Sequence, residues 1–544
     1  MIVPPRVDST FVRRHATGVT LLGFLGVAVA LSATPGVPSW LRPTDLLVAE
    51  DPVDAVASAL LAKPEAIPLP DQLEDQRQAT NDPLLLDAPA DEGPIEELAV
   101  QAEAPAEEAW VRSRWERPER PRFERYAERL GLEAAPLERP CLERRSDGCA
   151  RRAMDRFFGI LERVERGERA ARVVHFGDSL IASDKISDRV RRRMQERFGS
   201  SGRGYLMGKR FNQFQRGRRS GRGSDGWTIH TIVASLRSLP DRHFGFSGAS
   251  FTAEARGETL TFEPVSGSTE VAIHHLARPR GGELAVLADG ERIAVLDTGR
   301  PGEPRGTVTR YALPEGTETV VLRSRTPGPR VYGVALDAEV PGITWSSLGL
   351  PGATSAVWLR PGEDEFVRLL AERAPDLAVV MLGGNDGLML SKKRVSAEAI
   401  ERDLTRFLDR IRAARPGVDC LLVTPLEAVR QKGGGRLVPK PELQTILRIT
   451  RDVAQAEGCA LWDMYASMGG RGSLERWVDA GLMLGDLIHP KSRGSDLLGE
   501  MMTEAIMEAY DDRPDEAPGE PAPGGSGSGS GERPGDATGG SGAD

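Results

Sequence analysis

Short apolar runs that alternate with helical patterns are the feature of this sequence that most narrows the choice of fold. Each apolar run is the length of a strand and is bounded by a segment of helical periodicity. The runs are 172–176, 377–382, 420–424 and 459–462, and the helical segments are 186–198, 363–373, 397–414 and 442–457. A strand that is apolar along its whole length is buried on both faces. The pattern therefore predicts an α/β fold, with a parallel sheet between layers of helices.

The region from about residue 226 to residue 340 breaks this alternation. It has no good helical pattern, only short runs of alternating apolar residues separated by Gly, Pro and the turn signal Asp289-Gly290. A chain of 544 residues is also too long for one ordinary core. We expect an inserted all-β sandwich at 226–340, which divides the α/β unit into 122–225 and 341–510. Its size suits a carbohydrate-binding module, and a purely structural lid or spacer fits the pattern equally well.

Both ends of the chain have compositions that do not build a core. Residues 43–121 are rich in Ala, Pro, Glu and Asp, and residues 511–544 are rich in Gly, Ser and Pro. Segments of this kind bury too little apolar surface to fold. We predict a disordered acidic linker at 43–121 and a disordered tail at 511–544.

Residues 1–42 have the pattern of an export segment. Arg13 and Arg14 precede the apolar run 18–33, which ends with small residues in Leu31-Ser32-Ala33, before Thr34-Pro35. The run is shorter than the roughly 20 residues of a comfortable membrane span. A cleaved signal and an uncleaved membrane anchor therefore both remain open. Either one predicts a protein of a bacterial-type cell envelope, periplasmic or secreted.

Four cysteines are compatible with an exported chain. Cys141 and Cys149 lie close together in a polar stretch, as a small disulfide loop does in an oxidising compartment. Cys420 and Cys459 each belong to an apolar run, and we predict that they are buried free thiols. No group of residues has the spacing of metal ligands, so neither a metal nor another cofactor is expected.

The charge of the chain argues against a nucleic-acid partner. The formal net charge is -9, although most of the charged residues in 189–222 are Arg or Lys. A basic stretch of this length could meet an anionic polymer. A solvated helix face followed by a loop is the simpler interpretation.

Ser179 lies where a predicted strand ends and a helix is about to begin, in His175-Phe176-Gly177-Asp178-Ser179-Leu180. Ligand sites of α/β sheets form at the carboxyl ends of the strands. Backbone N–H groups at the start of a helix also point toward developing negative charge. Ser179 is therefore a candidate nucleophile, although Gly177-Asp178-Ser179-Leu180 alone also suits an ordinary turn or helix cap.

A serine nucleophile needs a base, and the chain has seven histidines. Only His489 has a carboxylate three residues before it, which is Asp486. Asp486 can accept a hydrogen bond from Nδ1 of His489, while Nε2 takes the proton of Ser179. His175 lies on the strand that leads to Ser179, where we expect it to pack.

Two further segments supply candidates for an oxyanion hole. Gly384-Asn385-Asp386 ends the next sheet strand, so the Asn385 amide can project from the same edge as Ser179. The Gly-rich loop 348–354, which contains Gly349 and Gly352, follows the apolar run near Ile343. A glycine there lets a backbone N–H come close to a substrate oxygen.

Together these segments resemble the motif blocks of the SGNH, or GDSL, hydrolase family. The matching residues, in chain order, are Gly177-Asp178-Ser179-Leu180, Gly352, Gly384-Asn385-Asp386 and Asp486-Leu487-Ile488-His489. The resemblance implies a three-layer, flavodoxin-like sheet with Ser179 as the nucleophile. It also implies an Asp486–His489 pair and an oxyanion hole from the Ser179 and Gly352 N–H groups and the Asn385 side chain, with Gly349 as the alternative to Gly352. A β-sandwich between the first two blocks is similar to the arrangement in envelope peptidoglycan O-acetylesterases.

This resemblance implies an exported serine esterase that removes O-acetyl groups from a polysaccharide through an acyl-enzyme on Ser179. The expected partner is an acetylated glycan of the cell envelope, with peptidoglycan first, and the membrane if the N-terminal segment is not cleaved. Two other functions stay open on the sequence. One is a polysaccharide O-acetyltransferase with the same catalytic residues, and the other is a glycan-binding envelope protein without activity.

Overall fold

The fold is described from a computed structural model that covers residues 121–513, except 147, 212–220, 235–240, 264, 266 and 433–435. The predicted export segment, the linker as far as residue 120 and the tail from residue 514 lie outside the described residues. Among the residues that are described, no helix combines the length and the apolar character that a membrane span requires.

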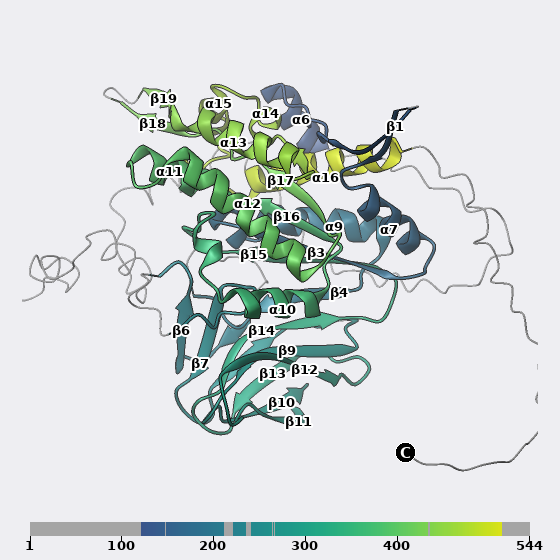
Figure 1. The fold of residues 1–544 in the computed structure, drawn as a ribbon, viewed down its shortest axis with the longest axis vertical. Helices are drawn as coiled ribbons and strands as arrows, with labels where there is room; N and C mark the ends of the chain where they lie inside the picture. The colour runs from purple at the N-terminus through teal and green to yellow at the C-terminus, as the bar shows by residue number, and fades with distance from the viewer. Residues whose placement is uncertain are drawn as a thin grey trace, which may run out of the picture.

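A five-stranded, fully parallel sheet forms the centre of the α/β unit, in the upper part of Figure 1. The strand order is β15-β3-β16-β17-β20. In chain order these strands are β3 (Ala170–Gly177), β15 (Gly342–Gly349), β16 (Leu377–Met381), β17 (Asp419–Val423) and β20 (Ala460–Trp462). Four of them are the apolar runs that the sequence singles out, and β15 is the run near Ile343. The predicted parallel α/β sheet is confirmed.

Helices cover both faces of this sheet. They are α7 (Asp155–Glu165), α9 (Lys185–Phe198) and α16 (Ser492–Asp511) on one face, and α10 (Glu363–Arg373), α12 (Ala397–Ala414) and α13 (Glu442–Ala456) on the other. Neighbouring residues of a strand enter different cores, so that Val379 packs on the α9 side and Val380 on the α12 side. Burial on both faces explains why the strands are apolar throughout.

The β unit, in the lower part of Figure 1, consists of two antiparallel sheets whose inner faces share one core. The first has the order β11-β10-β13-β8-β5, and the second has β12-β9-β14-β7-β6 with β4 paired to β14. The strands are β4 (Gly202–Met207), β5 (Arg222–Gly223), β6 (Trp227–Thr231), β7 (Ala249–Ala253), β8 (Thr259–Phe262), β9 (Glu270–Ala277), β10 (Glu283–Ala288), β11 (Glu291–Asp297), β12 (Arg305–Ala312), β13 (Val320–Ser324) and β14 (Arg330–Asp337). The predicted additional all-β domain is confirmed.

The β unit begins earlier than the predicted boundary at residue 226. β4 pairs with β14 and β5 pairs with β8, although both lie before that residue. The sequence of β4 contains Gly202 and Gly204, both at positive φ, so it lacks the regular alternation by which strands are recognised. β4 also touches the parallel sheet, where the N–H of Tyr205 donates to Ser346 Oγ of β15 at 3.1 Å.

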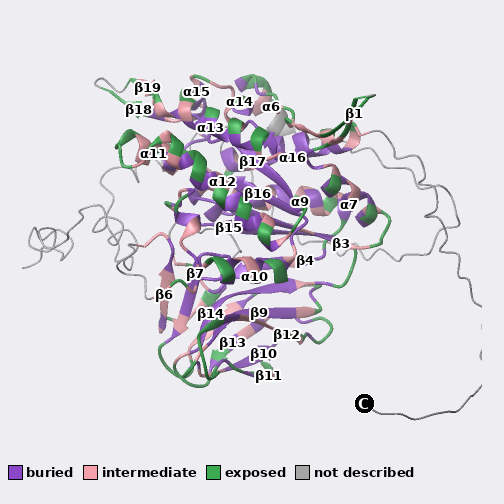
Figure 2. Ribbon diagram, in the orientation of Figure 1, coloured by how far each residue is buried: buried purple, intermediate pink, exposed green. Residues whose placement is uncertain are grey.

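The two units share a continuous core. Phe244 and Phe246 of the β unit belong to the same buried cluster as Phe176, Trp358 and Phe407 of the α/β unit. Figure 2 shows buried ribbon in the strands of both units, from β16 and β15 down to β14 and β9. The β unit is therefore packed against the α/β unit through a shared core and is not an independent domain on a linker.

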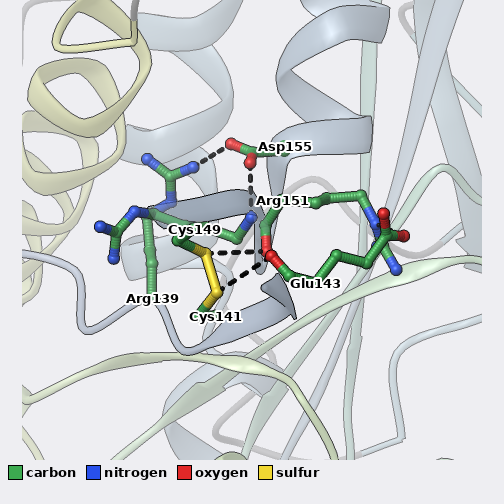
Figure 3. The surroundings of a disulfide bond; sticks show 7 residues. Arg139, Cys141, Glu143, Cys149, Arg151 and Asp155 are labelled. Carbon is green, nitrogen blue, oxygen red and sulfur yellow. Dashed lines mark hydrogen bonds and ion pairs between the residues drawn. A yellow bond between two sulfur atoms is a disulfide. The ribbon is translucent and has the colours of Figure 1, made fainter. Parts of the chain in front are cut away.

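Small elements complete the described structure. They are α6 (Pro121–Leu130), β1 (Cys141–Arg145), β2 (Gly148–Arg152), α8 (Ser179–Ala182), η4 (Val357–Leu359), α11 (Gly384–Ser391), β18 (Val429–Gln431), β19 (Leu437–Pro439), α14 (Met464–Ser467) and α15 (Ser473–Asp479). A disulfide between Cys141 and Cys149 joins β1 to β2, as Figure 3 shows. At the base of this hairpin Arg139 forms an ion pair with Asp155, which is the first residue of α7.

The prediction of free thiols at Cys420 and Cys459 is wrong, because these residues form a disulfide. β17 and β20 are parallel neighbours, and Leu421 pairs with Ala460 in their register. Cys420 and Cys459 each lie one residue earlier, and their Cα atoms are 4.8 Å apart. Apolar periodicity predicts each strand but not which strands are neighbours, so the sequence could not reveal this pairing.

Removing the Cys420–Cys459 disulfide is expected to destabilise the protein more than removing the Cys141–Cys149 disulfide. The residues of the first are 39 apart and those of the second 8 apart, and a longer closed loop constrains the unfolded chain more. We expect losses of roughly 4 and roughly 2.5 kcal/mol for the two double Cys→Ala variants. Urea unfolding of both variants under oxidising conditions measures this. Equal losses, or the reverse order, would contradict the expectation.

Candidate active site

Ser179 is the first residue of α8, directly after the carboxyl end of β3. Asp178 caps this short helix, with its Oδ1 accepting from the N–H of Leu180 at 3.0 Å. The turn is tight, since a Cβ placed on Gly177 would lie 2.3 Å from Ile181 Cγ1. The glycine thus allows α8 to fold back over the end of the sheet, and the serine lies at the sheet edge.

His489 contacts both of its predicted partners. Its Nε2 lies 2.7 Å from Ser179 Oγ, and its Nδ1 lies 2.7 Å from Asp486 Oδ2. The loop between α15 and α16 carries His489 and Asp486, and it turns through Leu487 at a φ of 59°. A left-handed conformation is costly for leucine, and such strain collects at functional sites. The loop is closed by a hydrogen bond of 2.8 Å from the N–H of Leu484 to the carbonyl oxygen of His489.

The Asp486 carboxylate is held in its charged form. Partial burial acts to raise its pKa, but hydrogen bonds from the His489 ring and from the backbone N–H groups of His489 and Ile488 outweigh it. The pKa of Asp486 is therefore lowered from its usual value. An ionised carboxylate at Nδ1 fixes the tautomer of His489 that leaves Nε2 free to accept a proton.

The two backbone candidates for an oxyanion hole are both free to donate. Within the described residues, the N–H groups of Ser179 and Gly352 make no hydrogen bond. Gly352 is exposed and has a φ of 85°. Gly349 is buried, and a Cβ there would lie 1.9 Å from the backbone N of Ala182, so this glycine serves packing against α8. The structure thus favours Gly352 over Gly349.

Asn385 lies near the same edge, in the first turn of α11. Its Nδ2 donates to the carbonyl oxygen of Ala353 at 3.0 Å and to Asp178 Oδ2 at 3.3 Å. These bonds place the amide between the turn of Gly352 and the turn of Ser179. Because both of its hydrogens are in use, a substrate oxygen has to replace one of these acceptors, and the contact to Asp178 is the longer.

Two buried carboxylates beside the site were not assigned a role on sequence grounds. Burial raises the pKa of Asp178 and of Asp386, each to about 6. Asp386 Oδ1 accepts from the N–H of Ser355 at 3.0 Å, and its Oδ2 has no hydrogen-bond partner in the described structure. Both belong to the motif segments Gly177-Asp178-Ser179-Leu180 and Gly384-Asn385-Asp386, and this position is the sequence signal that points to them. They link the loops that carry Ser179, Gly352 and Asn385.

His175 is fully buried beneath the site and contacts neither Ser179 nor His489. Trp345 donates to its Nδ1 at 3.3 Å, and burial lowers its pKa to about 3. This is a packing role. Across the described part of the chain, no group of three or more His, Cys, Asp or Glu side chains is arranged to hold a metal ion.

Comparison with known proteins gives a family match over part of the chain and a shared fold. Residues 315–497 match the model of the GDSL-like Lipase/Acylhydrolase family. The match takes in Gly352, Asn385, Asp486 and His489 but not Ser179, which the inserted β unit separates from them along the chain. No curated protein sequence matches the chain.

Among solved structures, that of a peptidoglycan O-acetylesterase is similar at a TM-score of 0.57 and 21% identity, over 66% of this chain and 97% of that chain. An acetylxylan esterase from Geobacillus stearothermophilus gives a TM-score of 0.24 and 18% identity, over 30% of this chain and 73% of that chain. The first similarity reaches well beyond the parallel sheet, and it shows a shared fold.

Replacing Asp486 by Asn is expected to lower kcat by about 10²–10⁴-fold, because an amide neither stabilises an imidazolium nor enforces the tautomer. KM should change far less, since Asp486 holds His489 and not the substrate. Steady-state hydrolysis of p-nitrophenyl acetate measures both constants. Asp479→Asn, an exposed carboxylate at the end of α15, is the matched control. An Asp486→Asn enzyme as active as this control would contradict the assignment.

The stability of the protein is expected to depend on pH through Asp386. Its folded pKa of about 6 lies above the ordinary value of 3.8, so the folded state keeps a proton that the unfolded chain releases. Stability therefore falls as the pH rises from about 4 to about 6, by up to about 3 kcal/mol for this group. Asp386→Asn should remove this part of the fall in urea unfolding, while Asp364→Asn on the exposed face of α10 should not. Parallel pH profiles for the two variants would show that Asp386 does not carry the effect.

Proposed function

We propose that this chain, of which residues 315–497 match the GDSL-like lipase/acylhydrolase family, is an exported serine esterase that removes O-acetyl groups from a cell-envelope polysaccharide. The observation that carries the proposal is the contact of 2.7 Å between Ser179 Oγ and His489 Nε2. Asp486 bonds the other nitrogen of the same ring. A hydroxyl, a base and a carboxylate in this order are the parts of a serine hydrolase.

The reaction proceeds through an acyl-enzyme. Ser179 Oγ attacks the carbonyl carbon of the acetyl ester while His489 Nε2 takes the hydroxyl proton. The N–H groups of Ser179 and Gly352, with the Asn385 amide, bond the oxygen that gains negative charge. When the C–O bond to the sugar breaks, His489 returns the proton to the sugar oxygen. Water then attacks the acetyl-Ser179 ester while His489 Nε2 takes a proton from it, and acetate leaves as His489 returns that proton to Ser179 Oγ.

The glycan is proposed on the basis of the fold. The similarity to the peptidoglycan O-acetylesterase covers 97% of that chain and extends over more of this chain than the family match does. This favours acetylated peptidoglycan as the substrate over a lipid or a small ester.

Export is supported by the cysteines and by the N-terminal sequence. Within the described residues, all four cysteines are paired in disulfides, which persist in oxidising compartments. The apolar run 18–33 with Arg13 and Arg14 before it supplies the signal or the anchor. We therefore place the protein in the periplasm or outside the cell, attached to the inner membrane if the run is not removed.

Ser179→Ala is expected to abolish hydrolysis of p-nitrophenyl acetate, with a loss of about 10³-fold or more, because the nucleophile is removed. Ser391→Ala serves as the matched control, since Ser391 is exposed at the end of α11. Thermal unfolding of each variant confirms that the comparison is between folded proteins. Hydrolysis undiminished in Ser179→Ala would rule out the proposed mechanism.

The substrate is tested by acetate release from O-acetylated peptidoglycan and, separately, from acetylated xylan. The proposal expects faster release from peptidoglycan and none with Ser179→Ala. Faster release from xylan would replace the proposed glycan. Transfer of acetyl groups to an added glycan acceptor, with little free acetate, would show a transferase. Binding to either polymer without any release would show a glycan-binding protein.

A further inference from the structure

A loop of the β unit reaches the turn that carries Gly352. Residues 232–234 follow β6, and they lie against the α/β unit at its active edge. A Cβ placed on Gly352 would lie 3.2 Å from Val233 Cγ1, which is closer than an ordinary contact. Val233 is half-buried, whereas Ile232 before it is fully buried. The side chain of Val233 is thus available beside a candidate oxyanion donor.

The backbone on each side of Val233 is fixed by one arginine. Arg360 Nη1 donates to the carbonyl oxygen of Ile232 at 2.7 Å and to that of Ala234 at 2.8 Å. Arg360 follows η4, so the clamp comes from the α/β unit. The N–H of Ile232 also donates to the carbonyl oxygen of Gly248 at 3.0 Å. With both neighbours held, Val233 has little freedom to move away from Gly352.

The β unit also packs against the residues that precede Gly352. A Cβ on Gly248 would lie 2.6 Å from Leu350 Cδ1 and 2.7 Å from Ile232 Cδ1, so these three residues are in close contact. Leu350 is two residues before Gly352, and its N–H donates to the carbonyl oxygen of Gly177 at 3.1 Å. The Gly352 turn is therefore held between the end of β3 and the β unit.

We propose that Val233 is a specificity-determining residue of the esterase, which limits the acyl group accepted by Ser179 to one about the size of acetyl. The inference rests on the proposed function, in which the Gly352 N–H bonds the carbonyl oxygen of the substrate. The acyl carbon chain begins two bonds from that oxygen. Because Val233 Cγ1 lies 3.2 Å from where a Cβ on Gly352 would stand, this branched side chain occupies the space beside the Gly352 turn into which a longer acyl chain would extend. The inserted β unit then forms part of the active site itself.

The test compares p-nitrophenyl acetate and p-nitrophenyl butyrate as substrates of the full chain. Val233→Ala should raise the ratio of kcat/KM for butyrate over acetate by about tenfold, at the low end of what one or two methylenes contribute in an apolar contact. Val233→Phe should lower the same ratio. Val295→Ala is the matched control, because Val295 is exposed on β11 at the far side of the β unit and should leave the ratio unchanged.

Arg360 supplies an independent variant. Arg360→Ala releases the loop and should shift the ratio in the same direction as Val233→Ala, while Arg360→Lys keeps a donor for the two carbonyl oxygens and should restore it in part. A general loss of stability would lower both activities together and leave the ratio alone.

The outcomes separate this inference from the proposed function. If hydrolysis depends on Ser179 but neither Val233 variant changes the ratio by more than about twofold, the inference is overturned and the esterase stands. If the wild-type chain hydrolyses neither ester, or does so without Ser179, the proposed function fails and the inference fails with it.

Discussion

The contact between Ser179 and His489 joins residues 310 positions apart, and the rest of the structure serves to make it. It depends on the parallel sheet, because parallel strands bring all their carboxyl ends to one edge. β3 delivers Ser179 there, β16 delivers Asn385, and the loop before α16 closes over them with His489. The buried faces of α9 and α16 pack together beneath this loop. The geometry of the site therefore depends on the packing that stabilises the sheet.

The inserted β unit does not disturb the parallel sheet, because the chain enters the β unit and returns from it at the same side of the sheet. β4 and β14 are paired, and β15 follows β14 to lie beside β3. Glu365 of α10 then fixes the junction. Its carboxylate accepts from the N–H groups of Gly245 and Gly306 and from Nδ1 of His243, at 2.7 to 3.1 Å. A buried carboxylate with this many donors rigidly attaches the β unit, which is what a wall of an active site requires.

Helices and pairs of residues close in the sequence could be predicted, because their signals are local. Contacts between segments distant in the sequence could not. The helix 397–414 coincides with α12, since its amphipathic pattern and its Ser396 cap are both local signals. The pairing of Asp486 with His489 also depends on local spacing. The prediction of free thiols at Cys420 and Cys459 is wrong because their contact depends on strand order. The burial of Asp178 and Asp386, and the approach of Val233 to Gly352, likewise arise only when distant segments meet.

The most direct measurement of the central claim is the site of acylation. Brief incubation with excess p-nitrophenyl acetate, acid quenching, proteolysis and mass spectrometry locate the acetyl group on the chain. The account predicts an acetyl ester on Ser179, formed and lost at rates consistent with turnover. Acetylation of another side chain at the turnover rate, with Ser179 unmodified, would contradict it.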